Sequence, residues 1–132
     1  MRKTAATSTA CTTVHLTANF ETNLAHIEAY WSDNQFPPGF DRLIAELQNT
    51  TIPILETHPR LGRPFFERHA QTLQAKQKIQ AITAQLAKLS ADAELREYVM
   101  TDYTTLYALV ADTLYLLAIK HHKQLVFDVG QI

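Results

Sequence analysis

Two apolar runs near the C-terminal end of the sequence constrain the fold most strongly. Residues 104–110 combine β-branched, aromatic and aliphatic side chains, and residues 114–119 are almost continuously apolar. Only residues 111–113 separate the runs, which leaves room for a tight connection. Because both faces of each run are apolar, the pattern predicts two central strands of a sheet, covered on one side and partly on the other.

Two amphipathic helices are predicted ahead of these strands. The first has Thr17 or Asn19 as its candidate N-cap, followed by an apolar stripe at helical spacing. That stripe consists of Phe20, Leu24, Ile27 and Trp31. A second stripe covers residues 40–55 and contains Pro53. Since a proline inside a helix removes a hydrogen bond and clashes with the preceding turn, we expect a kink or a restart at residues 50–53.

The remaining segments complete an α+β order. Residues 14–17 and 95–100 alternate apolar and polar side chains and predict strands. Residues 66–90 contain no Pro or Gly and predict a long helix, and residues 125–127 could add a short edge strand. We therefore predict an α+β fold in which an N-terminal strand and amphipathic helices pack on a C-terminal antiparallel sheet of three or four strands.

The predicted organisation is a flexible leader at residues 1–13 and a single domain at residues 14–132. The N-terminal strand is expected to join the C-terminal strands, and tyrosines 103, 107 and 115 are expected mainly in the core. The residues expected to dominate the core are Phe20, Leu24, Ile27, Leu47, Leu106, Val110, Leu116 and Ala118.

Composition excludes several classes of function. The 12 Lys and Arg residues are balanced by 13 Asp and Glu residues, so no global positive field attracts nucleic acid or an anionic membrane. No apolar run approaches the ~18 residues that span a bilayer. A single Cys11 excludes an internal disulfide framework and a zinc cluster, and the histidines show no metal-ligand spacing. We expect a cytoplasmic protein without a metal or another cofactor.

Four segments of the sequence together resemble the RelE/ParE superfamily, the toxins of bacterial toxin–antitoxin (plasmid stabilisation) pairs. Residues 14–30 are similar to the first strand and helix of that family, and residues 40–64 to its second helix and the Pro-x-x-Gly-Arg turn that ends it. Residues 95–107 are similar to its central strand pair, and residues 118–123 to its strand ending in a His-x-basic triplet. The Pro-x-x-Gly-Arg form of this turn favours the ParE branch of the superfamily.

The sequence also departs from the family pattern. The family's toxins are usually strongly basic, whereas this chain has a net charge of −1. Thr104 and Ala108 occupy positions where the family often has arginine after a tyrosine. Residues 65–94 form a longer, helical connection than family members usually have. Because cleavage of RNA needs fixed positive charge around the scissile phosphate, the two lost arginines argue against nuclease activity.

The candidate site residues lie at two places in the sequence. Arg60 and Arg63 flank Gly62, which permits a positive φ, at the end of the second helix. They are suited either to gripping a phosphate or carboxylate of a partner or to complementing the helix dipole. Lys120 and His122 are further candidates for binding a target or an antitoxin. His121 and Lys123 would be catalytic only in an endoribonuclease, in which imidazole transfers a proton and lysine holds phosphate. The simpler alternative for residues 120–123 is a solvated strand end.

The resemblance implies a toxin neutralised by a cognate antitoxin, a segment of which folds onto the toxin on binding. A ParE-like toxin arrests growth by binding DNA gyrase, and this is the function we predict. The alternatives are a RelE-like ribosome-dependent mRNA endoribonuclease and a non-toxic binding module of the same fold, so whether the protein is an enzyme stays open. An apolar stripe on residues 70–89 suggests that the protein forms a homodimer or a toxin–antitoxin complex.

Overall fold

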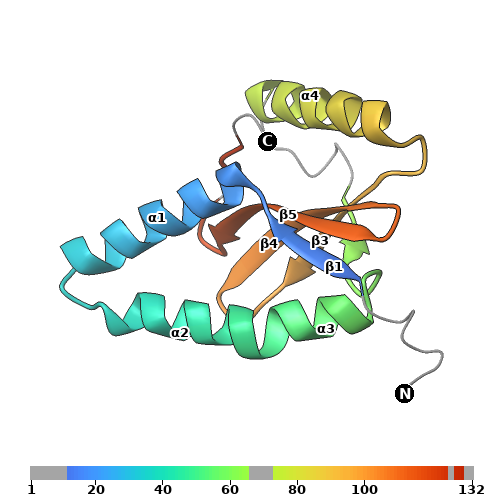
Figure 1. The fold of residues 1–132 in the computed structure, drawn as a ribbon. Coiled ribbons are helices and arrows are strands. Elements are labelled where there is room, and N and C mark those ends of the chain that lie inside the picture. The colour runs from blue at the N-terminus through green and yellow to red at the C-terminus, as the bar shows by residue number, and fades with distance from the viewer. Residues whose placement is uncertain (1–11, 66–72, 125–126, 130–132) are drawn as a thin grey trace, which may run out of the picture.

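A computed structural model describes residues 12–65, 73–124 and 127–129 (Figure 1). Within these residues the elements in chain order are β1 (Thr13–Leu16), α1 (Ala18–Asp33), α2 (Pro38–Glu46), a π-helical turn (Leu47–Thr51), α3 (Ile52–Thr57), β2 (Arg63–Pro64), α4 (Leu73–Leu89), β3 (Glu94–Val99), β4 (Tyr103–Val110) and β5 (Thr113–His121). Most of the expected leader lies outside the described residues, although its last residue, Thr13, begins β1. None of the described helices is long and apolar enough to cross a membrane.

The strands form one sheet in the order β1-β5-β4-β3-β2. The predicted pair at residues 104–119 is present as β4 and β5, which are antiparallel and connected by a tight turn with Ala111 at a φ of 55°. The N-terminal strand does join the sheet, but β1 runs parallel to β5, so the expectation of a purely antiparallel sheet was wrong. Parallel pairing needs a long crossover, which the helices between these strands help to supply.

β2 is the fifth strand of the sheet and was not predicted. Arg63 and Pro64 pair with Glu97 and Arg96 at the edge of the sheet, where we expected only a turn. A residue before proline favours extended backbone, and an edge strand tolerates proline because one side of it needs no sheet hydrogen bond.

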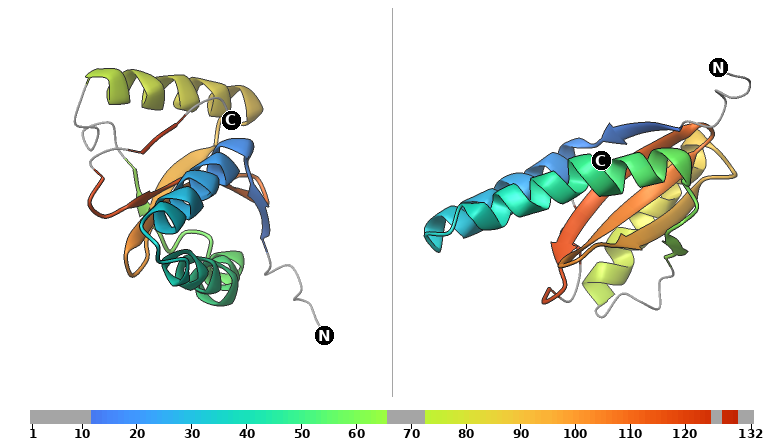
Figure 2. Two further views of the ribbon diagram at one scale, coloured as in Figure 1. Left: turned by 90° about the vertical axis from the view of Figure 1, so that its left-hand side faces the viewer. Right: turned by 90° about the horizontal axis from the view of Figure 1, so that it is seen from below.

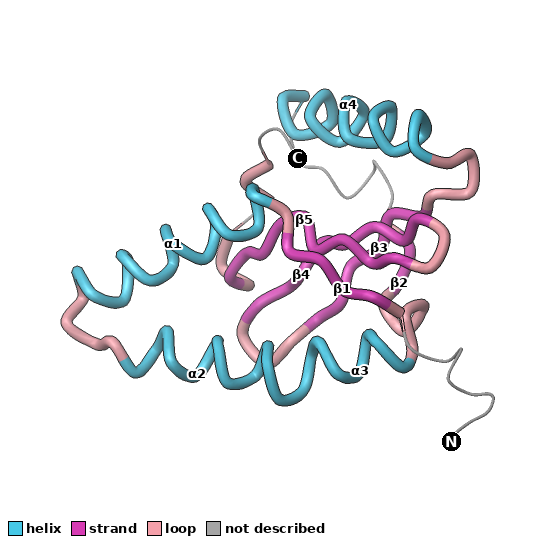
Figure 3. Tube along the Cα trace, viewed as in Figure 1, coloured by secondary structure: helices cyan, strands magenta, loops and turns pink. Residues whose placement is uncertain are grey.

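Helices cover both faces of the sheet. α1, α2 and α3 lie on one face and α4 lies on the other, as the two views of Figure 2 show. Figure 3 shows that α1 and α2 meet in a loop extending beyond the sheet. Alternate side chains of β4 therefore enter different cores: Tyr107 and Leu109 pack toward α1–α3, whereas Leu106 and Ala108 pack toward α4. This two-sided burial explains why both faces of the run are apolar.

Most of the predicted core residues are fully buried. Five of the eight meet that description: Phe20, Leu47, Leu106, Leu116 and Ala118. The other three are partly buried and pack against the same clusters: Leu24, Ile27 and Val110. Tyr103 and Tyr107 are core residues as expected, whereas Tyr115 is partly buried and stacks on His15 with ring centroids 5.7 Å apart.

The irregularity expected near Pro53 is a π-helical turn within one continuous helix, so a restart is not what the structure has. The chain passes from α2 through the π-helical turn, where the N–H of Ile52 donates to the carbonyl of Leu47 five residues earlier. α3 follows from Ile52 with helical backbone on both sides of the junction, so Pro53 is accommodated next to a π-bulge within the helix. Thr51 is completely buried at this junction.

Part of the apolar stripe of α4 is covered within the chain, whereas Leu73 at the start of the helix is 72% exposed. Ile79, Ile82 and Leu86 are buried in the core on that face of the sheet, together with Phe127 and Val129. This covered part of the stripe therefore gives no support to the predicted homodimer. Residues 66–72 of the predicted helix and residues 125–126 of the predicted edge strand lie outside the described residues, and Phe127 belongs to no strand.

Candidate functional site

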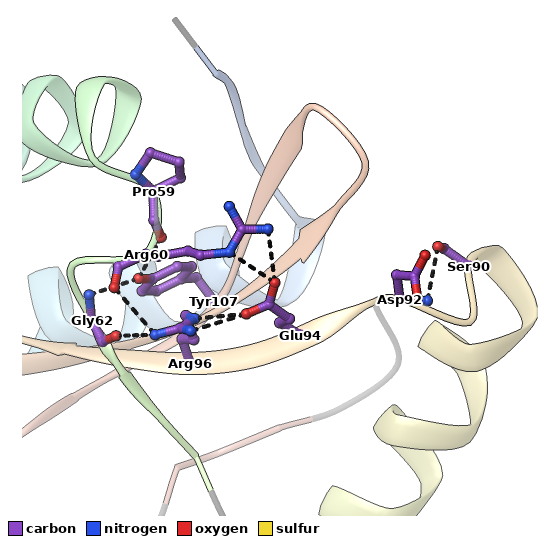
Figure 4. Close-up of polar contacts among 8 residues, drawn as sticks. All are labelled: Pro59, Arg60, Gly62, Ser90, Asp92, Glu94, Arg96 and Tyr107. Carbon is purple, nitrogen blue, oxygen red and sulfur yellow. Dashed lines mark hydrogen bonds and ion pairs between the residues drawn. The ribbon is translucent and has the colours of Figure 1, made fainter. Parts of the chain in front are cut away.

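The turn that ends α3 is held in place by side chains of β3 and β4 (Figure 4). The buried hydroxyl of Tyr107 donates to the carbonyl oxygen of Pro59 at 2.8 Å and accepts the N–H of Gly62 at 3.0 Å. Arg96 donates from Nη1 to the carbonyl oxygens of Gly62 at 2.6 Å and Arg60 at 3.2 Å. Residues 59–62 therefore have four hydrogen bonds to the sheet that fix the shape of the turn.

Gly62 is needed for space and not for a positive φ. No described glycine has a positive φ, so the conformational reason expected for Gly62 was wrong. A Cβ at this position would lie 2.5 Å from the Tyr107 hydroxyl and 2.6 Å from the carbonyl oxygen of Glu97. The backbone of Gly62 can approach the Tyr107 hydroxyl closely because glycine carries only a hydrogen atom where other residues have a Cβ.

Both arginines of the turn form ion pairs with carboxylates of β3. Arg60 lies 2.9 Å from Glu94, which also pairs with Arg96 at 3.0 Å, and Arg63 lies 2.5 Å from Glu97. Burial raises the pKa of the Glu94 carboxyl, but hydrogen bonds from Arg96 and Arg60 outweigh burial and lower it overall. No basic residue lies in the last turn of α3, so these cations are positioned by carboxylates and not by the helix dipole.

Lys120 projects to the face of the sheet that α4 covers. Its ammonium lies 5.3 Å from the ring centroid of Phe127 and donates to the carbonyl oxygen of Gln124 at 3.2 Å. Burial lowers the pKa of Lys120, while the charge of Glu97 raises it and that of Arg63 lowers it further. Arg63, Glu97 and Lys120 thus form one mixed-charge group, in which the carboxylate lies within the field of both cations.

His121 projects to the opposite face from Lys120. Its ring makes an edge contact with Tyr103, a residue of the α1–α3 core, with centroids 5.2 Å apart. Its Nδ1 accepts the main-chain N–H of Lys123 at 3.1 Å, which leaves the proton of the neutral ring on Nε2. Burial, followed by the charge of Lys123, lowers the pKa of His121. His122 lies exposed in the following turn, where Nε2 is 3.0 Å from the carbonyl oxygen of Tyr103.

β5 contains a β-bulge, and a hollow lies beside His121 farther along the strand. Tyr107 pairs with Leu116 and Leu106 with Ala118, so Leu117 is the extra residue. β1 pairs with β5 only up to Leu116, and α1 crosses the rest of that edge.

Beyond Leu116, two asparagines of α1 make hydrogen bonds to the main chain of β5 along this edge, where no described strand pairs with it. Asn19 Nδ2 donates to the carbonyl oxygen of Leu117 at 2.8 Å, and Asn23 Oδ1 accepts the N–H of Ile119 at 3.0 Å. Their amides also donate to the carbonyl oxygen of Asp128, at 3.1 Å from Asn19 and 3.2 Å from Asn23. The edge of β5 and residues 127–129 are thereby tied to α1.

The hollow is an aromatic pocket of about 380 Å³ between the second half of α1 and the ends of β4 and β5. Trp31 Nε1 donates to the Tyr103 hydroxyl at 3.0 Å across it. The residues that line the pocket are Asn23, His26, Ile27, Tyr30, Trp31, Tyr103, Ile119, His121, Lys123, Gln124 and Asp128.

The six candidate residues identified from sequence therefore do not form one site. Arg60 pairs with Glu94, and Arg63 and Lys120 lie with Glu97 on the other face of β3. His121 and Lys123 line the aromatic pocket, and His122 lies exposed in the turn after β5. Thr104 and Ala108, which stand where the family often has arginine, are buried in the sheet. Among the described residues, no group of three His, Cys, Asp or Glu side chains is placed to hold a metal ion.

Sequence reasoning missed the partners of these residues. Glu94 and Glu97 lie more than 30 positions after the arginines that they bind, and the register of β2 with β3 brings them together. The signal for the pocket was the single Trp31, which helical spacing places on a core face without indicating that it borders a hollow. A scan of the chain against protein-family models and a search of the curated proteins gave no match.

Proposed function

We propose that this protein is a growth-arrest toxin of the RelE/ParE type that acts by binding a protein target, with DNA gyrase as the first candidate, and that a cognate antitoxin neutralises it. The order of elements supports this proposal. A strand leads into two helical segments, α4 lies in the long connection that follows, and an antiparallel set of strands comes last, with β1 beside and parallel to β5. The order of the first strand, the helical segments and the last strands supports the proposal, whereas α4 and the parallel β1 do not add to it.

His121 lies apart from Lys120 and Arg63, and this is the main observation in favour of protein binding over RNA cleavage. Cleavage of a phosphodiester needs a proton-transfer group and several cations around one phosphate. Here Lys120 and His121 project to opposite faces of the sheet, and Arg63 is paired with the buried carboxylate of Glu97. Within the described part of the chain, Lys123 is the cation beside His121. A nuclease site is therefore less well supported than a protein-binding surface.

The turn at residues 59–63 has the properties of a protein-binding surface. Leu61 is 52% exposed between two arginines whose side chains are 67% and 64% exposed. Arginine is enriched among the residues that dominate binding energy, and a rigid loop loses less entropy on binding. Tyr107 and Arg96 provide that rigidity by hydrogen bonding the turn from below. We assign Arg60, Leu61 and Arg63 as the target-binding group.

The test is induced expression in bacteria with matched variants. Wild-type protein should arrest growth, and co-expression of a small protein encoded beside its gene should restore it. The Arg60→Ala, Arg63→Ala double variant should lose arrest, because it removes both exposed guanidinium groups. Lys78→Ala, which removes an exposed cation from α4, should keep it. Absence of arrest by the wild type would favour the non-toxic binding module.

A RelE-like endoribonuclease is the second candidate, and one observation favours it. The proton on Nε2 of His121 and the cation of Lys123 face the same pocket, which provides a proton-transfer group beside one positive charge. On this alternative, growth arrest would be lost in His121→Ala and retained when Arg60 and Arg63 are replaced.

A further inference from the structure

We propose that the aromatic pocket binds a small aromatic carboxylate, with the ring of the ligand against Trp31 and Tyr103 and its carboxylate toward His121 and Lys123. The volume of about 380 Å³ lies in the range of small-molecule sites. This inference does not depend on the proposed function, since the pocket contains none of the target-binding residues of the turn.

The walls of the pocket provide aromatic surface that is held in place. The Trp31 ring makes edge contacts with Tyr30 and Phe36, with centroids 5.2 and 5.9 Å away. It also packs so closely on Gly39 of α2 that a Cβ there would lie 2.4 Å from Trp31 Cδ2. The bond from Nε1 to the Tyr103 hydroxyl fixes the indole against β4. A planar ring can therefore enter without a large rearrangement of these side chains.

The polar groups of the pocket are chiefly hydrogen-bond donors. Burial raises the pKa of Tyr103, so its hydroxyl keeps its proton, and the bond accepted from Trp31 leaves that proton available. His121 presents Nε2–H because its Nδ1 is occupied by the Lys123 amide. Lys123 adds a full positive charge. Neither the Nε2 of His121 nor the ammonium of Lys123 has a partner among the described residues.

These donors select an anion over a cation or a neutral amide. The acceptors in the pocket are largely occupied: Asn23 Oδ1 accepts the N–H of Ile119, and the main-chain carbonyl of Asp128 accepts from two side-chain amides. The one carboxylate among the lining residues belongs to Asp128, which is exposed, and the charge of Asp102 also reaches Tyr103 and His121. A ligand carboxylate would satisfy donors that otherwise face solvent, and bonds between charged groups are the stronger ones.

Trp31 is the only tryptophan of the chain, so its fluorescence reports on this pocket directly. The probe is 3-phenylpropanoate, titrated at neutral pH into the full-length protein excited at the red edge of the indole band. Its neutral isostere 3-phenylpropanamide and its non-aromatic analogue 3-cyclohexylpropanoate serve as matched ligands. We expect a saturable change in fluorescence with the acid, and about tenfold weaker binding of the amide and of the cyclohexyl acid.

Three variants complete the test. Lys123→Gln should weaken binding of 3-phenylpropanoate about tenfold while leaving the weak binding of the amide unchanged. Tyr103→Phe, which also removes the partner of the Trp31 indole, should weaken binding of both ligands. Lys78→Gln on α4 should bind the acid as the wild type does. The proposal would be overturned by equal affinities for acid and amide, by equal affinities for the phenyl and cyclohexyl acids, or by no fluorescence response at roughly millimolar acid.

Discussion

The hydroxyl of Tyr107 on β4 lies 3.0 Å from the N–H of Gly62, in the turn that follows α3. It also donates to the carbonyl oxygen of Pro59, so one buried side chain satisfies two main-chain groups on the two sides of Arg60 and Leu61. This relationship connects the core of the sheet to the exposed residues assigned to target binding. Loss of the hydroxyl should therefore affect both stability and function.

Tyr107→Phe should lower the free energy of unfolding by about 2 kcal/mol, because the carbonyl of Pro59 and the buried N–H of Gly62 lose their partner. Denaturant unfolding measures the change. Tyr115→Phe is the matched control, since Tyr115 is only partly buried and its hydroxyl makes no hydrogen bond with the described residues. Equal loss in the two variants would show that the hydroxyl of Tyr107 does not hold the turn.

Thr51→Val should raise the free energy of unfolding by about 1 kcal/mol. The hydroxyl of Thr51 is buried in the π-helical turn and has no hydrogen-bond partner among the described residues. Valine has nearly the same shape and removes the uncompensated polar atom. Thr50→Val, at an exposed position next to it, should change stability little. A loss of stability in Thr51→Val would mean that the hydroxyl is satisfied in solution.

The Glu94 ion pairs should make stability depend on pH. The carboxyl has a lower pKa in the folded protein than in the unfolded chain, so its contribution is complete above the unfolded pKa. It is lost as pH falls through the lower, folded value. Glu94→Gln should therefore flatten the decline in unfolding free energy below about pH 5. Glu28→Gln, an exposed carboxyl of α1, should keep the wild-type decline, and identical profiles for all three proteins would contradict the assignment.

The sequence predicted the strands and helices whose side-chain pattern is set by burial. β4 and β5 were predicted because their two-sided burial appears as continuous apolar runs, and α1 because its stripe follows helical spacing. Two features of the sheet left no such pattern. The periodicity of a strand does not specify whether it pairs parallel or antiparallel, so the parallel pairing of β1 was not predicted. The bulge at Leu117 was not predicted because Leu117 is apolar like its neighbours and leaves the pattern of the run unchanged.

The candidate site was predicted only in part for a related reason. Residues 120–123 and the two arginines of the turn were identified as candidates from the sequence. The face of the sheet on which each side chain lies and the residues that it contacts depend on strand register, which the sequence pattern does not give. Lys120 and His121 face opposite ways because adjacent residues of a strand alternate, and Arg63 finds Glu97 because β2 pairs with β3. Long-range pairing of this kind is decided by the tertiary fold.

The central claim, toxicity through protein contact without RNA cleavage, is tested most directly by exposing purified gyrase and mRNA-loaded ribosomes to the same protein. Wild type and His121→Ala should inhibit gyrase equally, the Arg60→Ala, Arg63→Ala double variant should lose at least about tenfold in potency, and no mRNA should be cut. Ribosome-dependent cleavage that disappears in His121→Ala, with gyrase unaffected, would contradict the account.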